Sequence, residues 1–139
     1  MAHETPRMTL ALENINAYYG ESHILRNVSF TIEPGEVVCL MGRNGMGKTT
    51  TLKTLTGLLP ARSGTITFDG RDITQDRTDL RAKRGLAYVP QGREIIPHLT
   101  VHQNLLLGYW NRPSITGDVS EKDAFDEVYH LFPKLTQIL

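Results

Sequence analysis

The sequence has few of the features that mark secreted or membrane-spanning proteins. Cys39 is the only cysteine, so a disulfide within the chain and a cysteine zinc site are both excluded. The longest apolar run, Val37 to Met41, is far shorter than the roughly 20 residues that cross a bilayer. Residues 1–7 place no apolar run behind their charges, so we expect a disordered tail and no secretory signal. These absences predict a cytoplasmic protein with Cys39 as a buried core thiol.

A net charge is absent as well. The 15 Lys and Arg residues balance the 15 Asp and Glu residues, so no overall field favours nucleic acid or an anionic membrane as a partner. The alternating charges between Arg71 and Arg84 indicate a solvated surface. At 139 residues, the chain is long enough to bury a core and is either one domain or part of a larger one.

The most informative feature that is present is a phosphate-binding loop. Residues 42–49 read GRNGMGKT and match G-x-x-x-x-G-K-[ST] at every fixed position. The glycines let backbone N–H groups converge on a phosphate, and Lys48 adds a point charge for the β- and γ-phosphates. The Thr49 hydroxyl suits Mg²⁺. The sequence therefore predicts that this loop binds a nucleotide with Mg²⁺, and that Gly42, Gly45 and Gly47 are among the binding residues.

The surrounding pattern supports the loop. Residues 36–41 are predicted to form a buried parallel strand before it, and Leu52, Leu55 and Leu59 recur at helical spacing after it. Gly57 and Pro60 are predicted to end this helix. Residues 85–89 are predicted to form a second core strand, with Gln91 just beyond its end. If the two strands are neighbours, Gln91 lies near the loop, because ligands bind beyond the carboxyl ends of parallel strands.

Other elements are predicted by local patterns. Alternation indicates antiparallel strands at 8–12 and 27–32 and a strand at 65–68 that ends in a turn. Capping signals begin helices after Thr100 and Ser120, the second ending near Leu131, with residues 111–117 as the loop between them. One helical turn is expected near residues 79–83. His98 and His102 are not expected to bind a metal, since no third ligand stands at a plausible spacing.

Tyr18 and Tyr19 precede a turn at Gly20. Such a pair ordinarily packs against the turn. Beside a phosphate-binding loop, a tyrosine ring is also suited to stack on the flat face of adenine. Both interpretations stay open on the residues alone.

Together these motifs resemble the ATP-binding subunit of ABC transporters, from about Leu10 to the last residue. The resemblance rests on Tyr19-Gly20, Val-Ser-Phe, Pro-Gly-Glu, the 42–49 loop, Ser-Gly-Thr-Ile, Phe-Asp-Gly and Tyr-Val-Pro-Gln. It implies an α/β fold, namely a P-loop NTPase core with an antiparallel β subdomain of the ABC-ATPase type. Residues 8–91 are expected to be the ATP-binding core and residues 92–139 a partial helical subdomain.

The resemblance also implies residue roles. Tyr19 corresponds to the ring that stacks on adenine, and Gln91 to the glutamine that touches Mg²⁺ and the attacking water. Lys48 and Gln91 are the expected catalytic residues, and Thr49 and Gln91 the expected metal ligands. The backbone at Asn44, Gly45, Gly47 and Lys48 is expected to hold the phosphates, with Thr50 reaching the α-phosphate. The implied partners are a second ATP-binding subunit and transmembrane permease subunits, whose coupling helices residues 92–103 would face at the inner side of the cell membrane.

Residues 18–25 and 88–105 resemble the subfamily that energises branched-chain amino acid uptake, and within it the urea-uptake branch. The sequence lacks the family's LSGGQ signature, the Walker B aspartate with its catalytic glutamate, and the switch histidine. It therefore looks like the amino-terminal part of such a subunit, with an unfinished sheet. We expect it to hydrolyse ATP very poorly alone, because phosphoryl transfer depends on those positioning groups.

Two functions stay open on this evidence. The chain is part of an ATPase that drives transport, or it is a catalytically inactive fragment that binds nucleotide or docks to a partner. A P-loop kinase or GTPase fits poorly, since the guanine-reading Asn-Lys-x-Asp is absent.

Overall fold

The computed structural model describes residues 9–92, 94–110 and 119–138. They form two compact units, one ending at Arg81 and the other beginning at Ala82. The tail predicted at 1–7 and the loop predicted at 111–117 lie outside the described residues. The expected division between residues 91 and 92 stays a prediction.

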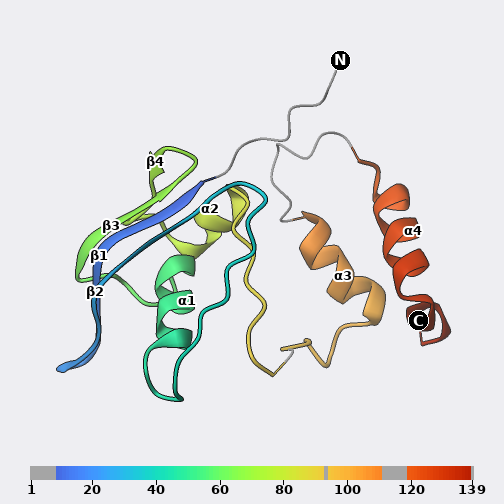
Figure 1. Ribbon diagram of the computed structural model, residues 1–139. Helices are drawn as coiled ribbons and strands as arrows, with labels where there is room; N and C mark the ends of the chain where they lie inside the picture. Colours follow the sequence, from blue (N-terminus) through green and yellow to red (C-terminus); the bar gives the residue numbers. More distant parts are fainter. Residues whose placement is uncertain (1–8, 93, 111–118, 139) are drawn as a thin grey trace. The chain divides into compact units, whose positions relative to one another are not determined.

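The first unit contains a four-stranded antiparallel sheet in the order β2-β1-β3-β4. Its strands are β1 (Leu10–Tyr19), β2 (Ser22–Ile32), β3 (Ser63–Phe68) and β4 (Arg71–Asp72), as Figure 1 shows. The antiparallel strands predicted at 8–12 and 27–32 and the strand predicted at 65–68 are thus confirmed, apart from residue 8, which lies outside the described residues. β1 and β2 extend further than predicted, as far as the turn at Gly20, because bulges keep them paired through a less regular stretch.

One face of the sheet forms the core of this unit. Its buried side chains come from three strands, each at most 7% exposed: Leu12, Ile15, Ala17, Leu25, Ile66 and Phe68. Helix α1 (Lys48–Thr56) contacts β2 and buries Leu55. It ends at Gly57, whose left-handed backbone (φ 83°) caps it as the sequence predicted.

The face that α1 buries differs from the predicted leucine stripe. Leu52 is 43% exposed, whereas Thr50, Thr51, Thr54 and Thr56 are buried. Three of these hydroxyls donate to the carbonyl four residues earlier: Thr51 to Gly47 (2.8 Å), Thr54 to Thr50 (2.8 Å) and Thr56 to Leu52 (3.0 Å). Because these bonds satisfy the hydroxyls, the threonines pack as small β-branched side chains.

Helix α2 (Thr78–Lys83) confirms the predicted turn near 79–83, but the predicted solvated surface is wrong at Arg81. Arg81 is only 3% exposed. Its guanidinium donates to the carbonyls of Thr54 (2.8 Å) and Leu55 (2.7 Å) at the end of α1. It also donates to the carbonyls of Thr74 (2.9 Å) and Asp76 (2.9 Å). Burial lowers the pKa of Arg81, and the charge of Asp76 partly opposes that shift.

The two predicted parallel core strands are wrong. Residues 36–41 and 86–90 have no strand structure, and Val37 and Val89 are 96% and 87% exposed. Cys39 is exposed, so its predicted burial is wrong too. A strand requires a hydrogen-bonded neighbour, and within the described part of the chain neither run has one.

The second unit contains α3 (Val101–Trp110), α4 (Glu121–Leu131) and a 3-10 helix, η2 (Pro133–Gln137). Both predicted caps are confirmed. The Gln103 N–H donates to Thr100 Oγ1 (3.1 Å) while the Thr100 N–H donates to Gln103 Oε1 (2.9 Å). The Asp123 N–H donates to Ser120 Oγ (3.1 Å). No described helix has the length and apolar character needed to cross a membrane.

Candidate nucleotide-binding site

The 42–49 loop leads directly into α1 and presents a set of backbone donors. Gly45 and Gly47 adopt left-handed conformations (φ 82° and 95°), and Gly47 is the residue at the cap of α1. Among the described residues, the N–H groups of Asn44, Gly45, Gly47 and Lys48 have no acceptor. Such donors at a helix N-terminus form an anion-binding concavity, because the helix dipole adds positive potential there.

Gly47 is also the point where the loop rests on the sheet. A Cβ at this position would lie 2.8 Å from Leu25 Cδ2 and 3.6 Å from Ile24 Cγ2. Gly47 is buried, whereas Gly42 to Met46 are exposed. The loop is therefore fixed on β2 at Gly47, while residues 42–46 are exposed.

Lys48 lies across the loop. Its Nζ donates to the carbonyl of Gly42 and to that of Arg43 (3.0 Å), so the ammonium is held by the loop that it is predicted to serve. The side chain is half-buried and has no acidic partner among the described residues. Its positive charge is thus available to an anion.

The two threonines after Lys48 differ in environment. Thr49 is exposed, and its hydroxyl has no partner within the described residues. A hydroxyl of this kind suits Mg²⁺, because Mg²⁺ prefers oxygen ligands and is usually held by protein oxygens together with substrate phosphates. Thr50 is 6% exposed and lies on the packed side of α1. The described residues contain no cluster of His, Cys, Asp or Glu that could hold a metal without such a substrate.

Tyr18 and Tyr19, at the end of β1, also differ. Tyr18 is packed between other side chains, as the ring of His23 stacks on it at 4.2 Å and the guanidinium of Arg62 lies 3.9 Å from its centre. Tyr19 is 46% exposed and has no ring contact among the described residues. Each of the two open interpretations therefore fits one tyrosine: Tyr18 packs at the turn, and Tyr19 presents a ring that is available for stacking.

Gln91 belongs to the other unit, where it is exposed beside Pro90 and Gly92. Its approach to the loop stays a prediction. In the same unit, the side chain of Asn104 accepts from Ile96 N–H (3.0 Å) and donates to the carbonyls of Ile96, Leu99 and Thr100. This asparagine, which sequence reasoning missed, fixes the segment that precedes α3.

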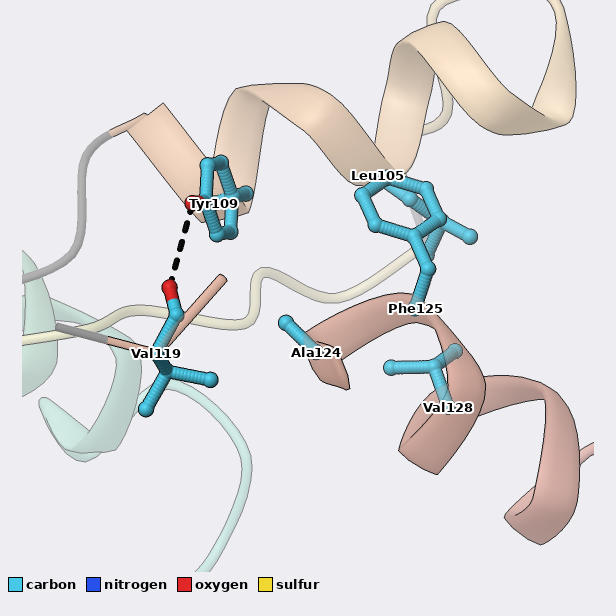
Figure 2. A pocket seen from close by; sticks show the side chains of 7 residues that line it. Leu105, Tyr109, Val119, Ala124, Phe125 and Val128 are labelled. Carbon is cyan, nitrogen blue, oxygen red and sulfur yellow. Dashed lines mark hydrogen bonds between the residues drawn. The ribbon is translucent and has the colours of Figure 1, made fainter. Parts of the chain in front are cut away.

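A separate cavity of about 410 Å³ lies between α3 and α4 (Figure 2). The only side-chain polar group in its lining, the Tyr109 hydroxyl, donates to the Val119 carbonyl (3.2 Å). With no cation in the lining, this cavity does not suit a triphosphate. Its lining residues are Leu105, Gly108, Tyr109, Val119, Ala124, Phe125 and Val128.

Comparison with known proteins decides the family. A family model described as ABC transporter matches residues 25–137, which is most of the chain. The chain belongs to this family. The sequence resemblance is confirmed at this level, while the branched-chain amino acid and urea branches are not distinguished from others.

The names of the ABC relatives give different transported substrates. The chain is 35% identical over 132 residues to the high-affinity branched-chain amino acid transport ATP-binding protein BraG of Pseudomonas aeruginosa, covering 92% of this chain and 53% of BraG. It is 36% identical over 128 residues to the ribose import ATP-binding protein RbsA of Oceanobacillus iheyensis, covering 92% of this chain and 26% of RbsA. It is 34% identical over 125 residues to the lipopolysaccharide export system ATP-binding protein LptB of Escherichia coli, covering 88% of this chain and 52% of LptB. The chain thus spans about half, or less, of these relatives.

Solved ABC structures show the same fold. A crystal structure of an ATP-binding cassette in its ADP conformation has a TM-score of 0.71 and 27% identity, over 96% of this chain and 56% of the cassette. A nucleotide-free cassette has a TM-score of 0.65 and 26% identity, over 94% of this chain and 56% of the cassette. The predicted fold class is confirmed: the chain has the α/β ABC-ATPase fold with its antiparallel sheet, corresponding to the amino-terminal part of the domain.

Proposed function

We propose that this chain is the nucleotide-binding part of an ABC ATPase subunit and that it binds ATP with Mg²⁺. The observation that carries the proposal is the set of N–H groups of Asn44, Gly45, Gly47 and Lys48 at the start of α1, which have no acceptor among the described residues, with the Lys48 ammonium beside them. These groups match the size and charge of the β- and γ-phosphates.

Each predicted site residue has a role in this proposal. Backbone N–H groups of Asn44, Gly45, Gly47 and Lys48 donate to the phosphates, Gly42 allows the loop to turn, and Thr50 supports the α-phosphate. Tyr19 stacks on adenine, and Thr49 and Gln91 ligate the metal. When bound, Mg²⁺ supplies charge that neutralises the phosphate oxygens. Lys48 acts on the same oxygens, and Gln91 orients the attacking water in the complete subunit.

The whole protein is proposed to energise an importer through ATP binding and hydrolysis. Two ATP-binding subunits would close on ATP and move a transmembrane permease, which holds the subunit at the inner face of the membrane. The identity to BraG supports branched-chain amino acids as cargo, and the likeness of residues 18–25 and 88–105 to the urea-uptake branch supports urea. Residues 92–103 are the proposed contact with the permease, and Asn104 is hydrogen-bonded to Ile96, Leu99 and Thr100 within them.

A calorimetric comparison of ATP, ADP and AMP tests the binding proposal. With Mg²⁺ present, affinity should fall at each step as phosphates are removed, because the loop donors and Lys48 act on the β- and γ-phosphates. Equal affinity for ATP and AMP would contradict the assignment of the loop.

A catalytically inactive nucleotide-binding or docking fragment is the second candidate. The runs at 36–41 and 85–89 favour it, because neither has strand structure and Val37 and Val89 are exposed, so no strand holds Gln91 in a fixed position. Both candidates bind ATP and neither expects turnover by this chain alone, so ATP hydrolysis measured on the whole protein separates them.

A further inference from the structure

The end of the β1–β2 hairpin is held by one side chain from outside it. β1 pairs with β3 only as far as Asn16, opposite Ser63, whereas it pairs with β2 to Tyr19, opposite Ser22. The last three residues of β1 therefore belong to a two-stranded ribbon. Such a ribbon is marginally stable by itself.

Arg62 lies just before β3 and reaches this ribbon. Its guanidinium carbon lies 3.9 Å from the centre of the Tyr18 ring, and its Nη2 donates to the Gly20 carbonyl (3.4 Å). Its backbone N–H donates to the Asn16 carbonyl (2.8 Å). Arg62 thus contacts the hairpin at Asn16, where the pairing of β1 with β3 ends, and at the turn.

His23 completes the stack from β2. Its ring is nearly parallel to that of Tyr18, with 7° between the planes, and its Nε2 is hydrogen-bonded to Asn16 Oδ1 (2.9 Å). The Tyr18 ring therefore has a cation and a second ring as neighbours, both tied to Asn16. We call Arg62, Tyr18 and His23 the turn stack.

The turn stack acts on Tyr19 through the backbone. Tyr19 follows Tyr18 directly in β1 and pairs with Ser22, after a shift in the pairing register between Ala17 and Tyr18. Because the two tyrosines share a planar peptide unit, fixing Tyr18 restricts the direction in which Tyr19 leaves the strand.

We propose that Arg62 is a positioning residue that holds Tyr19 in place for the base of the nucleotide, acting through the turn stack. This inference rests on the proposed ATP site and extends it to residues outside the recognised motifs. Arg62 contributes to recognition of the nucleoside part of the ligand and contributes nothing to recognition of its phosphates.

The test compares Mg²⁺-ATP with Mg²⁺-tripolyphosphate, which has the phosphates but no base. In the 139-residue protein, Arg62→Met should weaken ATP binding about two- to fivefold, the size expected for loss of an exposed cation–π contact. Tripolyphosphate affinity should not change. Arg26→Met is the matched control, since Arg26 is an exposed arginine of β2 outside the stack, and neither affinity should change in it.

Three further substitutions, Tyr19→Ala, Tyr18→Leu and Tyr18→Phe, separate positioning from a general loss of structure. In a Tyr19→Ala background, Arg62→Met should cause no further loss of ATP affinity, because its effect passes through Tyr19. Tyr18→Leu removes the stacked ring and should reproduce the effect of Arg62→Met, while Tyr18→Phe keeps the ring and should bind ATP normally.

Equal weakening of ATP and tripolyphosphate by Arg62→Met would overturn the inference, as would an undiminished effect in the Tyr19→Ala background. Binding of neither ligand by the unsubstituted protein would overturn the proposed function and this inference with it. Normal tripolyphosphate binding together with an unchanged ATP affinity in Arg62→Met would overturn the inference alone.

Discussion

At the scale of single residues, the phosphate-binding loop combines backbone donors with side chains of distinct roles. The Lys48 ammonium donates hydrogen bonds to two carbonyls of the loop itself. Thr49 is exposed, and its hydroxyl has no protein partner among the described residues. These features follow from the order of residues 42–49, since each depends on neighbours within a few positions. A motif with such local causes can be recognised in the sequence alone.

Thr49→Val tests the metal role of the hydroxyl. We expect ATP affinity in Mg²⁺ to fall about fivefold, roughly the worth of one hydrogen bond or ligand contact, with folding stability unchanged because the hydroxyl has no partner in the described structure. The measurement is calorimetric titration in Mg²⁺ and again in EDTA. An equal loss of affinity in EDTA would show that the hydroxyl does not act on the metal.

Gly47→Ala tests the close packing of the loop against β2. Its Cβ would lie 2.8 Å from Leu25 at φ 95°, so we expect unfolding free energy to fall by about 2–4 kcal/mol, from backbone strain plus the clash. Gly45→Ala is the matched control, because Gly45 also has a positive φ (82°) but nothing within 4 Å of a Cβ. It should lose only about 1–2 kcal/mol. Urea unfolding of both variants measures the difference, and equal losses would contradict the close packing at Gly47.

At the scale of elements, features with local causes were predicted and features with distant partners were not. The capping box at Thr100 and Gln103 and the glycine after α1 are confirmed, because each depends on residues a few positions apart. The expected strands at 36–41 and 85–89 are absent, because a strand depends on a neighbour that sequence patterns do not reveal.

Arg81 is the clearest case of a distant partner. Its four carbonyl acceptors come from α1 and from the segment between β4 and α2, so its burial could not be read from the charge pattern of residues 71–84. It connects the end of the phosphate-binding helix to the turn before α2.

Arg81→Met should therefore lower the unfolding free energy by about 2–4 kcal/mol, since it leaves buried carbonyls without donors. Arg81→Lys should recover only part of the loss, because an ammonium does not reproduce the forked geometry of the guanidinium. Thermal and urea unfolding measure both. Arg77→Met is the control: Arg77 pairs with Asp79 on the surface (3.0 Å) and should contribute almost nothing. A loss of unfolding free energy at Arg81 as small as that at Arg77 would contradict a stabilising role for the hydrogen bonds of Arg81.

At the scale of the whole molecule, the chain combines an antiparallel sheet and the phosphate-binding loop with two apolar runs, residues 36–41 and 85–89, that have no strand partner among the described residues. The proposed binding groups around residues 42–50 lie in the first unit, whereas Gln91 lies in the second. Nucleotide binding is therefore proposed to depend mainly on residues of the first unit, whereas hydrolysis also requires Gln91 of the second.

Turnover should accordingly be very slow in this chain. We expect purified 139-residue protein to release phosphate from ATP at a rate indistinguishable from that of its Lys48→Ala variant, because the sequence lacks the Walker B aspartate and the catalytic glutamate that the resemblance implies for the whole subunit. A coupled phosphate-release assay makes the comparison. Steady turnover that Lys48→Ala abolishes would contradict this expectation and favour a complete active site.

The most direct test of the central claim is titration of the purified chain with a fluorescent ATP analogue in Mg²⁺. We predict saturable binding that Lys48→Ala and Tyr19→Ala both weaken, while Lys53→Ala, which removes the same charge from the other end of α1, leaves it nearly unchanged. No saturable binding by a folded chain, or binding that is indifferent to Lys48 and Tyr19, would contradict the claim that this chain forms an ATP site.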